Sequence, residues 1–514
     1  MSRPLVILAA LVLAAAGLLP IAAMAARVAP ADLAGLFDAR ALELLGRTLG
    51  YGLSSTALAV VLGAPFGFLV AKTDLPLAAW LGPLGVVPLL LPPMLIAMVA
   101  TELTSLEGGA AAVLVSGVGT FPLMGLFTAR AFERIDGRLD EAALLAGGTR
   151  AAVRASLYPV LPAVLSGACL AFVFTVNDFS IPDYVSWVGA EKFSVYADSI
   201  FAAWRIDARP GTAVATALPL VALTLAALLP ALALRRRGAL ATLGAGYRRG
   251  RVLPLGPWRW PAFALAAALV ALAALLPIAR LAFEAGGGTR PGGWSSAAFT
   301  AAFQRALELA RGDLQNSVLY ALAAASLCAL LGLVLGHALE RAPRGRVFEP
   351  LVLLPLAVPA ILFGIGVIAT WNHAWCAPFY DGGGLVVLLL TGRFAALSVL
   401  ALGAAVAMLD PSHEDAARVS GARPAARLFR IVAPSLRSSW AGAWVLVFVF
   451  ALRELDSTIL VPAANHTAMF RVFNALHFGR DDFVAALALL TVALILLPSA
   501  LWVLFGRPRA EPAP

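Results

Sequence analysis

The dominant feature of the chain is a series of apolar segments, each about as long as a membrane-spanning helix. A helix that crosses the hydrocarbon core of a bilayer needs about 20 mostly apolar residues. Such segments recur along the 514 residues at Leu5–Ala26, Leu49–Ala71, Leu77–Ala100, Ala110–Phe127, Leu161–Ile181, Thr212–Leu234, Trp260–Phe283, Ser317–Leu339, Pro350–Thr370, Leu385–Met408, Ser438–Val461 and Phe483–Phe505. In lipid, a helix satisfies its own backbone hydrogen bonds. The sequence therefore predicts an all-α polytopic membrane protein with about 12 transmembrane helices.

Composition agrees with this prediction and argues against catalytic or metal-binding roles. The chain is 61% apolar and 13% charged, whereas soluble domains are about 45–50% apolar and about 25% charged. Cys169, Cys328 and Cys376 are too few and too scattered for a disulfide framework or a zinc site. His373 and Cys376 share a short polar stretch, but two donors make a poor metal site, so we favour a loop. We expect no catalytic residues and no metal.

The amino-terminal apolar segment has two interpretations. Arg3, an apolar run and the small residues Ala22–Ala26 resemble a signal peptide with its cleavage site. The run is also long enough to span a bilayer, and its removal would leave an odd number of helices. We therefore favour its retention as the first helix.

The arginines predict the orientation of the chain. The formal charge of +9 comes mainly from arginine, with five arginines in Arg130–Arg154, six in Arg235–Arg251 and five in Arg418–Arg437. Positive residues concentrate in cytoplasmic loops of membrane proteins. We expect these loops and both termini in the cytoplasm. Arginines in loops beside the lipid bilayer explain the net positive charge, so we expect the bilayer as a partner and no nucleic acid.

The two halves of the chain are related in sequence. Matching features occur in the same order in each half: Ala41-Leu42-Glu43-Leu44 and Ala306-Leu307-Glu308-Leu309, Pro88 with Pro92 and Pro355 with Pro359, Phe172-Val173-Phe174 and Phe448-Val449-Phe450. The prolines predict breaks or kinks in the third helix of each half. We predict tandem six-helix repeats over 1–235 and 259–514, joined by a basic cytoplasmic linker, 236–258. An even helix number makes the repeats parallel, with a substrate path expected between them.

A polar loop with one shared pattern lies between the fourth and fifth helices of each repeat. We call these the first recurring loop (132–160) and the second recurring loop (409–436). Each contains an acid, two alanines, three further residues and a glycine: Glu141, Ala142, Ala143 and Gly147 in the first, Asp415, Ala416, Ala417 and Gly421 in the second. An acid favours a helix start and a glycine a helix end. We predict a short cytoplasmic helix in each loop. Its small alanine side chains would allow a partner protein to approach the helix closely and bind it.

This pattern resembles the EAA loop of ABC importer permeases, which reads Glu-Ala-Ala, three residues, Gly, nine residues and Ile-x-Leu-Pro. The second loop fits through Gly421, Ile431 and Pro434, with Asp415 in place of Glu and Ala433 in place of Leu. The first loop reaches Pro159 one residue early. In detail the chain looks most like the fused permeases of the ferric-iron and thiamine importer group, with Arg453-Glu454-Leu455 as a supporting feature.

The resemblance implies a type I-like permease subunit with ferric iron or thiamine as substrate. It also implies two copies of a separate ABC ATPase, one on each recurring loop, and an extracytoplasmic substrate-binding protein. A P-loop needs Gly-Lys followed by Ser or Thr. Lys72 and Lys192 do not follow glycine, so ATP and magnesium are expected on the partner, and this chain is expected to bind no cofactor.

Two alternatives come from other classes of protein. A major facilitator transporter also has six plus six helices, but it carries a Gly-Asp-Arg-Gly-Arg-like loop after its second helix. The corresponding segment here, Ala71–Pro76, lacks that pattern. A membrane-embedded enzyme would need an active site, and the sequence offers no candidate.

Polar and charged residues within predicted spans are candidates for function, because they are costly in lipid. They are Asn177, Asp178 and Ser180 in the fifth helix, Arg453, Glu454 and Asp456 at the aligned positions of the eleventh, and Arg393 in the tenth. We predict that they line an outer vestibule or pathway. In the alternative, the two helices end early before Pro182 and Pro462 and these residues begin solvated loops, while Arg393 snorkels to the interface.

Overall fold

The computed structural model describes residues 3–33, 36, 38–207, 210–240, 250–343, 345–479 and 481–505. Within these residues the chain is helical apart from its connections and an isolated parallel bridge between Thr73 and Leu253. Part of the predicted linker, 241–249, lies outside the described residues, and Arg248 and Arg249 lie there too.

Contacts divide the chain into two compact units that are discontinuous in sequence. Unit 1 contains Met1–Ala34, Ile200–Ala215 and Glu284–Pro514, and unit 2 contains Gly35–Ser199 and Thr216–Phe283. The amino-terminal segment is thus grouped with the second half of the chain, and the segment after the linker with the first half. The predicted repeats 1–235 and 259–514 describe relatedness in sequence and stay a prediction.

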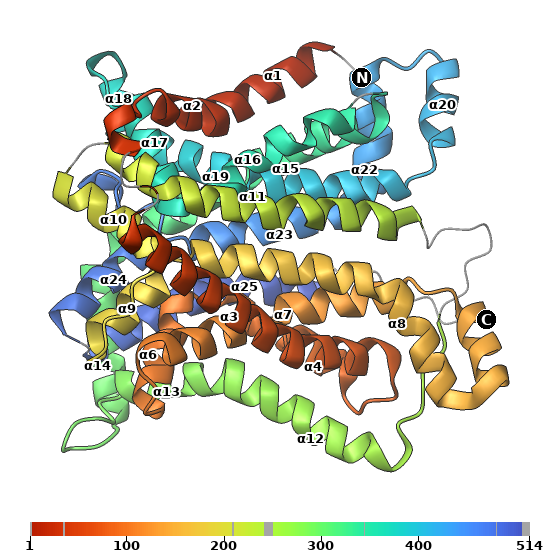
Figure 1. Ribbon diagram of the computed structural model, residues 1–514, viewed down its shortest axis with the longest axis horizontal. Helices are drawn as coiled ribbons and strands as arrows, with labels where there is room; N and C mark the ends of the chain where they lie inside the picture. Colours follow the sequence, from red (N-terminus) through yellow and green to blue (C-terminus); the bar gives the residue numbers. More distant parts are fainter. Residues whose placement is uncertain are drawn as a thin grey trace. The chain divides into compact units, whose positions relative to one another are not determined.

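The helices of unit 2 include long α-helices and shorter segments between them (Figure 1). They are α3 (Ala39–Lys72), α4 (Ala78–Leu84), α5 (Val87–Leu90), α6 (Pro93–Leu103), α7 (Gly108–Glu133), α8 (Gly137–Asn177), α9 (Ser180–Val188), η3 (Gly256–Trp258), α12 (Arg259–Val270) and the π-helical η4 (Ala271–Leu275). α10 (Tyr196–Asp207), α11 (Pro210–Leu240) and α13 (Leu276–Ala285) cross the sequence limits of the units. α3, α7 and α8 pack together around Ala59, Phe121, Met124 and Ala171.

Unit 1 has a matching set, in which α15, α19 and α23 pack together. Its helices are α1 (Arg3–Leu13), the π-helical η1 (Ala14–Leu18), α2 (Leu19–Ala25), η2 (Pro30–Leu33), α14 (Ser296–Leu309), α15 (Arg311–Arg341), η5 (Gly345–Phe348), α16 (Glu349–Ala357), α17 (Ala360–Trp371), η6 (Ala374–Cys376), α18 (Ala377–Tyr380), α19 (Gly383–Met408), α20 (Ser412–Val419), α21 (Pro424–Arg427), the π-helical η7 (Leu428–Val432), α22 (Ala433–Ser435), α23 (Arg437–Leu452), η8 (Ala463–Asn465), α24 (Ala468–Phe478) and α25 (Asp482–Phe505).

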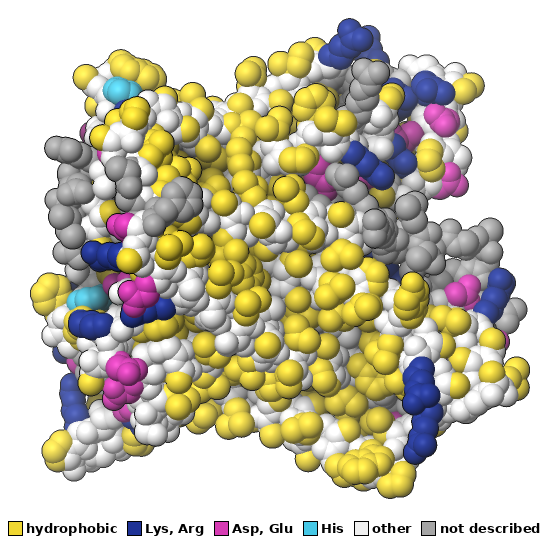
Figure 2. All heavy atoms as spheres, viewed as in Figure 1, with side chains coloured by type: hydrophobic (Ala, Val, Ile, Leu, Met, Phe, Trp, Pro, Cys, Tyr) yellow, Lys and Arg dark blue, Asp and Glu magenta, His cyan; other side chains and the backbone are white. Residues whose placement is uncertain are grey.

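The helices are long and apolar enough to make this an all-α polytopic membrane protein. Among the described residues, 8 helices meet the length and apolarity of a membrane span, or up to 11 if each sharply bent pair counts as one span. A shorter apolar helix covers Asp482–Pro498. Figure 2 shows apolar side chains along the middle of the helices, with charged side chains gathered near helix ends.

Two predicted helices end earlier than expected. The predicted span Ser438–Val461 is helical only to Leu452, and Leu161–Ile181 is interrupted after Asn177. In both places an acid accepts a hydrogen bond from the backbone N–H three residues later: Asp178 from Ile181 at 2.9 Å, and Glu454 from Ser457 at 2.9 Å. Short acceptor side chains that bond local N–H groups compete with helix continuation. Apolarity alone did not reveal these capped turns.

The prolines break the third helix of each half, as predicted. The pair α4–α5 and α6 bends by 94°, and the pair η5–α16 and α17 bends by 98°. Pro92 and Pro359 stand immediately before α6 and α17 as their N-caps. Because proline has no N–H, the preceding helix cannot continue its hydrogen-bond pattern through these residues.

The first helix of each half shows a repeat that our sequence comparison missed. Leu18–Ala22 and Leu275–Ala279 both read Leu-Leu-Pro-Ile-Ala, and a π-helical turn ends at the first leucine of each. In unit 1, a Cβ atom on Gly392 would lie 2.1 Å from the carbonyl oxygen of Ala16. Only glycine allows α19 to approach η1 this closely.

Candidate functional site

The first recurring loop forms the amino-terminal part of α8. The side chain of Asp136 caps this helix by accepting a hydrogen bond from the Arg138 N–H at 3.0 Å. The helix is interrupted at Gly147 and Gly148, and Gly148 has a φ of +67°. A left-handed residue favours glycine. The predicted helix end therefore lies here, with the left-handed position at Gly148 rather than at Gly147.

The second recurring loop forms α20, which carries Glu414 and Asp415 in its first turn. Gly421 follows the helix with a φ of +78°. The next N–H, that of Ala422, donates back to the Ala417 carbonyl at 3.0 Å, and the Gly421 N–H donates to the Arg418 carbonyl at 3.1 Å. This is the arrangement in which a glycine terminates a helix.

Each loop presents an acid and an apolar side chain on one exposed helix face. Glu141 and Asp415 are exposed, and four residues later Leu145 is 91% exposed and Val419 is 87% exposed. Residues four apart are neighbours on a helix surface. Of the alanines, Ala142 and Ala416 are exposed, and Ala143 and Ala417 are half-buried. The exposed Leu145 and Val419 were not singled out from the sequence, although both stand at the same place in the shared pattern.

The acid just before each exposed acid points inward instead. Asp140 is fully buried, and its Oδ2 lies 2.5 Å from the Nζ of Lys72 at the end of α3. Glu414 is half-buried, and it contacts His337 and Arg341 at the end of α15 at 2.7 and 3.0 Å. Sequence reasoning did not single out either inward-pointing acid, because their partners are distant in the chain.

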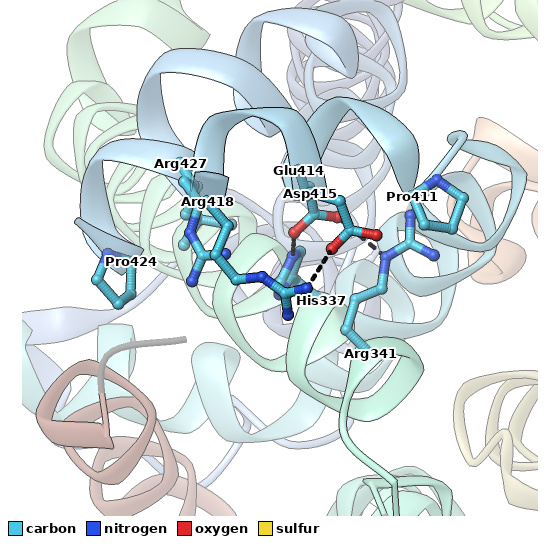
Figure 3. A pocket seen from close by; sticks show the side chains of 9 residues that line it. His337, Arg341, Pro411, Glu414, Asp415, Arg418, Pro424 and Arg427 are labelled. Carbon is cyan, nitrogen blue, oxygen red and sulfur yellow. Dashed lines mark hydrogen bonds and ion pairs between the residues drawn. The ribbon is translucent and has the colours of Figure 1, made fainter. Parts of the chain in front are cut away.

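Glu414 lies beside a small cavity in the second loop (Figure 3). The cavity measures about 240 Å³, and its lining includes Arg418 and Arg427 as well as Glu414 with its two partners. Burial raises the pKa of the Glu414 carboxyl, but its hydrogen bonds and charge interactions with His337 and Arg341 outweigh burial and hold it below the usual value. Glu414 is therefore ionised at neutral pH.

The polar residues near the end of α8 bond mainly to their own surroundings. Asn177 is buried, and its Nδ2 donates to the Val173 carbonyl at 2.8 Å and to the Thr224 hydroxyl of α11 at 3.1 Å. Asp178 is half-buried, and its Oδ1 accepts from the Ser180 hydroxyl at 3.1 Å. Ser180 itself is buried and starts α9.

The aligned residues after α23 form a matching turn. Glu454 also accepts a hydrogen bond from the hydroxyl of Ser457, at 2.6 Å. Arg453 lies over the ring of Phe450, 4.6 Å from its centroid, and Asp456 is buried. These residues begin a turn, as in the alternative interpretation, but they are at least partly buried rather than solvated.

Arg393 is buried in α19 and reaches the break between α16 and α17. Its Nη1 donates to the carbonyls of Pro355 at 3.1 Å and of Val358 at 2.6 Å. Pro359, which lacks an N–H, stands four residues after Pro355, so the arginine replaces the missing helical donor. The charge of Arg393 also interacts with Glu454 and Asp456. Three of the predicted pathway residues are thus brought into one cluster within unit 1.

Comparison with known proteins finds a family match in the carboxyl-terminal part of the chain. Residues 329–509 match the family described as the binding-protein-dependent transport system inner membrane component. Within these residues the chain is similar to an ABC permease domain.

Curated relatives of the chain are permease proteins of transport systems. The putrescine transport system permease protein PotI of Escherichia coli K12 is 27% identical over 220 residues, which cover 40% of this chain and 77% of PotI. The ferric transport system permease protein FbpB of Actinobacillus pleuropneumoniae is 27% identical over 190 residues, 36% of this chain and 27% of FbpB. A putative FbpB of Haemophilus influenzae is 29% identical over 165 residues, 31% of this chain and 26% of that protein. These relatives are consistent with the predicted ferric-type group.

The matched residues contain the second recurring loop and the cluster of Arg393, Glu454 and Asp456. The first recurring loop and Asp178 lie outside the matched residues. Within the part of the chain that the structure describes, no three His, Cys, Asp or Glu side chains are grouped so that they could hold a metal ion. The family match and the relatives support the general role of a transport permease.

Proposed function

We propose that this chain is the permease subunit of a bacterial inner-membrane ABC importer, and that each recurring loop docks one copy of a cytoplasmic ATPase. ATP and magnesium bind to that partner, and this chain holds no cofactor of its own. An extracytoplasmic binding protein delivers the substrate. Both termini and both recurring loops lie in the cytoplasm, in keeping with the arginine distribution.

One observation carries the docking proposal. A short helix that ends at a left-handed glycine presents an exposed acid and, one turn later, an exposed leucine or valine, and it does so in both loops. A large apolar side chain that is about nine-tenths exposed at a helix end is suited to burial in a partner's pocket. Two matching faces fit two copies of one partner.

The substrate we propose is a small cationic solute or metal ion. Ferric iron and thiamine are the candidates from the resemblance, and the names of the relatives add putrescine. All three are cations. The acids Asp178, Glu454 and Asp456 supply negative charge near helix ends, and with Arg453, Asn177 and Ser180 they are our candidates for an outer vestibule. Arg393 is proposed to hold that region in place.

The docking proposal is tested by affinity purification from detergent, with the expected outcome of two ATPase copies per chain. A Leu145→Asp, Val419→Asp double variant should lower ATPase capture at least tenfold, because a charge replaces each exposed apolar contact. Val347→Asp is the matched control, since Val347 is 72% exposed but lies outside both recurring loops. Equal capture by the wild type and the double variant would contradict docking at these faces.

The energy source is tested by uptake into proteoliposomes that contain the assembled complex. Uptake should require ATP and survive collapse of the proton gradient. Uptake that stops when the gradient collapses while ATP stays high would favour a secondary transporter instead.

A further inference from the structure

We call the part of α8 before Gly147 and the whole of α20 the docking helices. We propose that Asp140 and Glu414 are positioning residues that couple each docking helix to the second helix of its repeat. Each acid holds its recurring loop against the carboxyl-terminal end of that helix, α3 or α15. Force applied to the exposed face of the loop is then passed to a membrane span. This inference rests on the proposed function, because it assumes that an ATPase grips the exposed face.

The first attachment is a buried and well-bonded ion pair. The side chains of Lys72 and Asp140 are 2% and 0% exposed, and their charged atoms lie 2.5 Å apart. The hydroxyl of Ser156 donates to Oδ1 of Asp140 at 3.2 Å, and the backbone N–H of Arg251 donates to Oδ2 at 3.0 Å. Removing one partner of a buried pair leaves an uncompensated charge. The docking helix and α3 are therefore held together at this point.

The same site also holds the chain that leads into α12. The Leu253 N–H donates to the Lys72 carbonyl at 2.8 Å, and the Asp74 N–H donates to the Leu253 carbonyl at 3.2 Å. Asp74 in turn accepts a hydrogen bond from the Leu255 N–H at 2.8 Å. Asp140 thus joins three segments: the docking helix, the end of α3 and the part of the linker that leads into α12.

The second attachment uses different residues at the corresponding place. Glu414 bonds His337 Nε2 at 2.7 Å through one carboxylate oxygen and Arg341 Nε at 3.0 Å through the other. Arg341 also donates through Nη2 to the Leu409 carbonyl at 2.7 Å, just before the loop helix. Figure 3 shows Glu414 directed toward both basic side chains of α15, while the neighbouring Asp415 pairs with Arg418. The basic residues differ from the lysine that pairs with the first loop. In both loops, an acid of the docking helix bonds basic side chains at the end of the second helix of its repeat.

The helix geometry explains why adjacent acids have different tasks. Successive residues on an α-helix point about 100° apart, because a turn has 3.6 residues. Asp140 and Glu414 therefore face their own repeat, while Glu141 and Asp415 remain exposed. Local capping does not account for the inward acids, since Asp136 already caps α8 and Ser412 N–H is bonded by Asp410. Attachment to the second helix is what the two inward acids share.

The test separates ATPase binding from its coupling to transport. The double variant Asp140→Asn, Glu414→Gln keeps the exposed faces, so two ATPase copies per chain should still co-purify. Uptake per ATP hydrolysed in proteoliposomes should fall at least tenfold. Arg346→Gln is the control, because it removes an ion pair whose arginine is 58% exposed and lies outside both loops. The control should keep the wild-type ratio.

Rescue experiments guard against simple misfolding. Lys72→Arg keeps the positive charge and should retain uptake per ATP. The swap Lys72→Asp, Asp140→Lys restores opposite charges and should recover part of the ratio lost in Asp140→Asn. A normal ratio in the double variant would overturn the inference, and so would loss of ATPase capture in step with uptake. If the wild-type chain captures no ATPase, the proposed function itself fails, which is a distinguishable result.

Discussion

Nη1 of Arg393 lies 2.6 Å from the carbonyl oxygen of Val358, at the break where α16 gives way to α17. The same nitrogen bonds the Pro355 carbonyl, which loses its helical donor because Pro359 has no N–H. A residue that the sequence suggested as a pathway lining thus has a structural task at a broken helix. Its task in transport stays a prediction.

Arg393→Met should destabilise the protein. A buried acceptor that loses its donor costs about 1–3 kcal/mol. The variant leaves two carbonyls without the arginine donor, in a site with little access to water. We expect a lower thermal midpoint in detergent and reduced uptake, with partial retention in Arg393→Lys. Arg346→Gln, which alters a pair whose arginine is 58% exposed, should change stability by less than about 1 kcal/mol. An unchanged midpoint for Arg393→Met would contradict the structural task.

Gly148→Ala and Gly421→Ala should each weaken a docking helix end. Both glycines have positive φ values, +67° and +78°, where an L-residue with a side chain costs about 1–2 kcal/mol. Reduced ATPase capture, measured by affinity purification, is the expected result. Gly46→Ala is the matched control, because no neighbouring atom lies within 4 Å of its added Cβ. Wild-type capture by both loop variants would show that the left-handed turns are not needed for docking.

Gly392→Ala should loosen the packing of the amino-terminal helix on α19. The added Cβ would meet the Ala16 carbonyl oxygen at 2.1 Å, and overpacking of this kind costs about 1–3 kcal/mol. The thermal midpoint should fall. Gly312→Ala on α15 meets no atom within 4 Å and should leave the midpoint nearly unchanged. Equal midpoints for the two variants would argue against close approach at Gly392.

Asp198→Asn should stabilise the protein at alkaline pH more than at acidic pH. Burial raises the pKa of the Asp198 carboxyl to about 6, although the Val195 N–H bonds it at 2.6 Å, and Asp183 adds like charge. The folded state therefore favours the protonated acid. The cost of ionisation is absent below pH 4, grows between pH 4 and 6, and is fully present above pH 6.

The measurement is the thermal midpoint in detergent at pH 5 and pH 8. The variant should exceed the wild type by about 2–4 °C at pH 8, with a smaller difference at pH 5. Glu43→Gln, which changes an acid that is 59% exposed, should show little dependence on pH. A constant difference for Asp198→Asn at both pH values would contradict the raised pKa.

The apolar spans, the proline breaks and the positions of the two recurring loops could be predicted from the order of the amino acids. These features depend on neighbours along the chain: apolar length, a missing proline N–H, and a glycine that accepts a left-handed turn. Even so, apolar length placed the end of the eleventh helix beyond Leu452, where the capped turn at Glu454 ends it.

The side chains that meet across distant segments could be found only in the folded chain. Lys72 pairs with Asp140, and Arg393 reaches Pro355 and Val358, across gaps that no local pattern spans. No local sequence pattern predicted that the amino-terminal helix would be grouped with the second half of the chain. Apolarity places a helix in the membrane but does not choose its neighbour there. That choice comes from close packing of small residues and from the need of each buried charge and carbonyl for a partner.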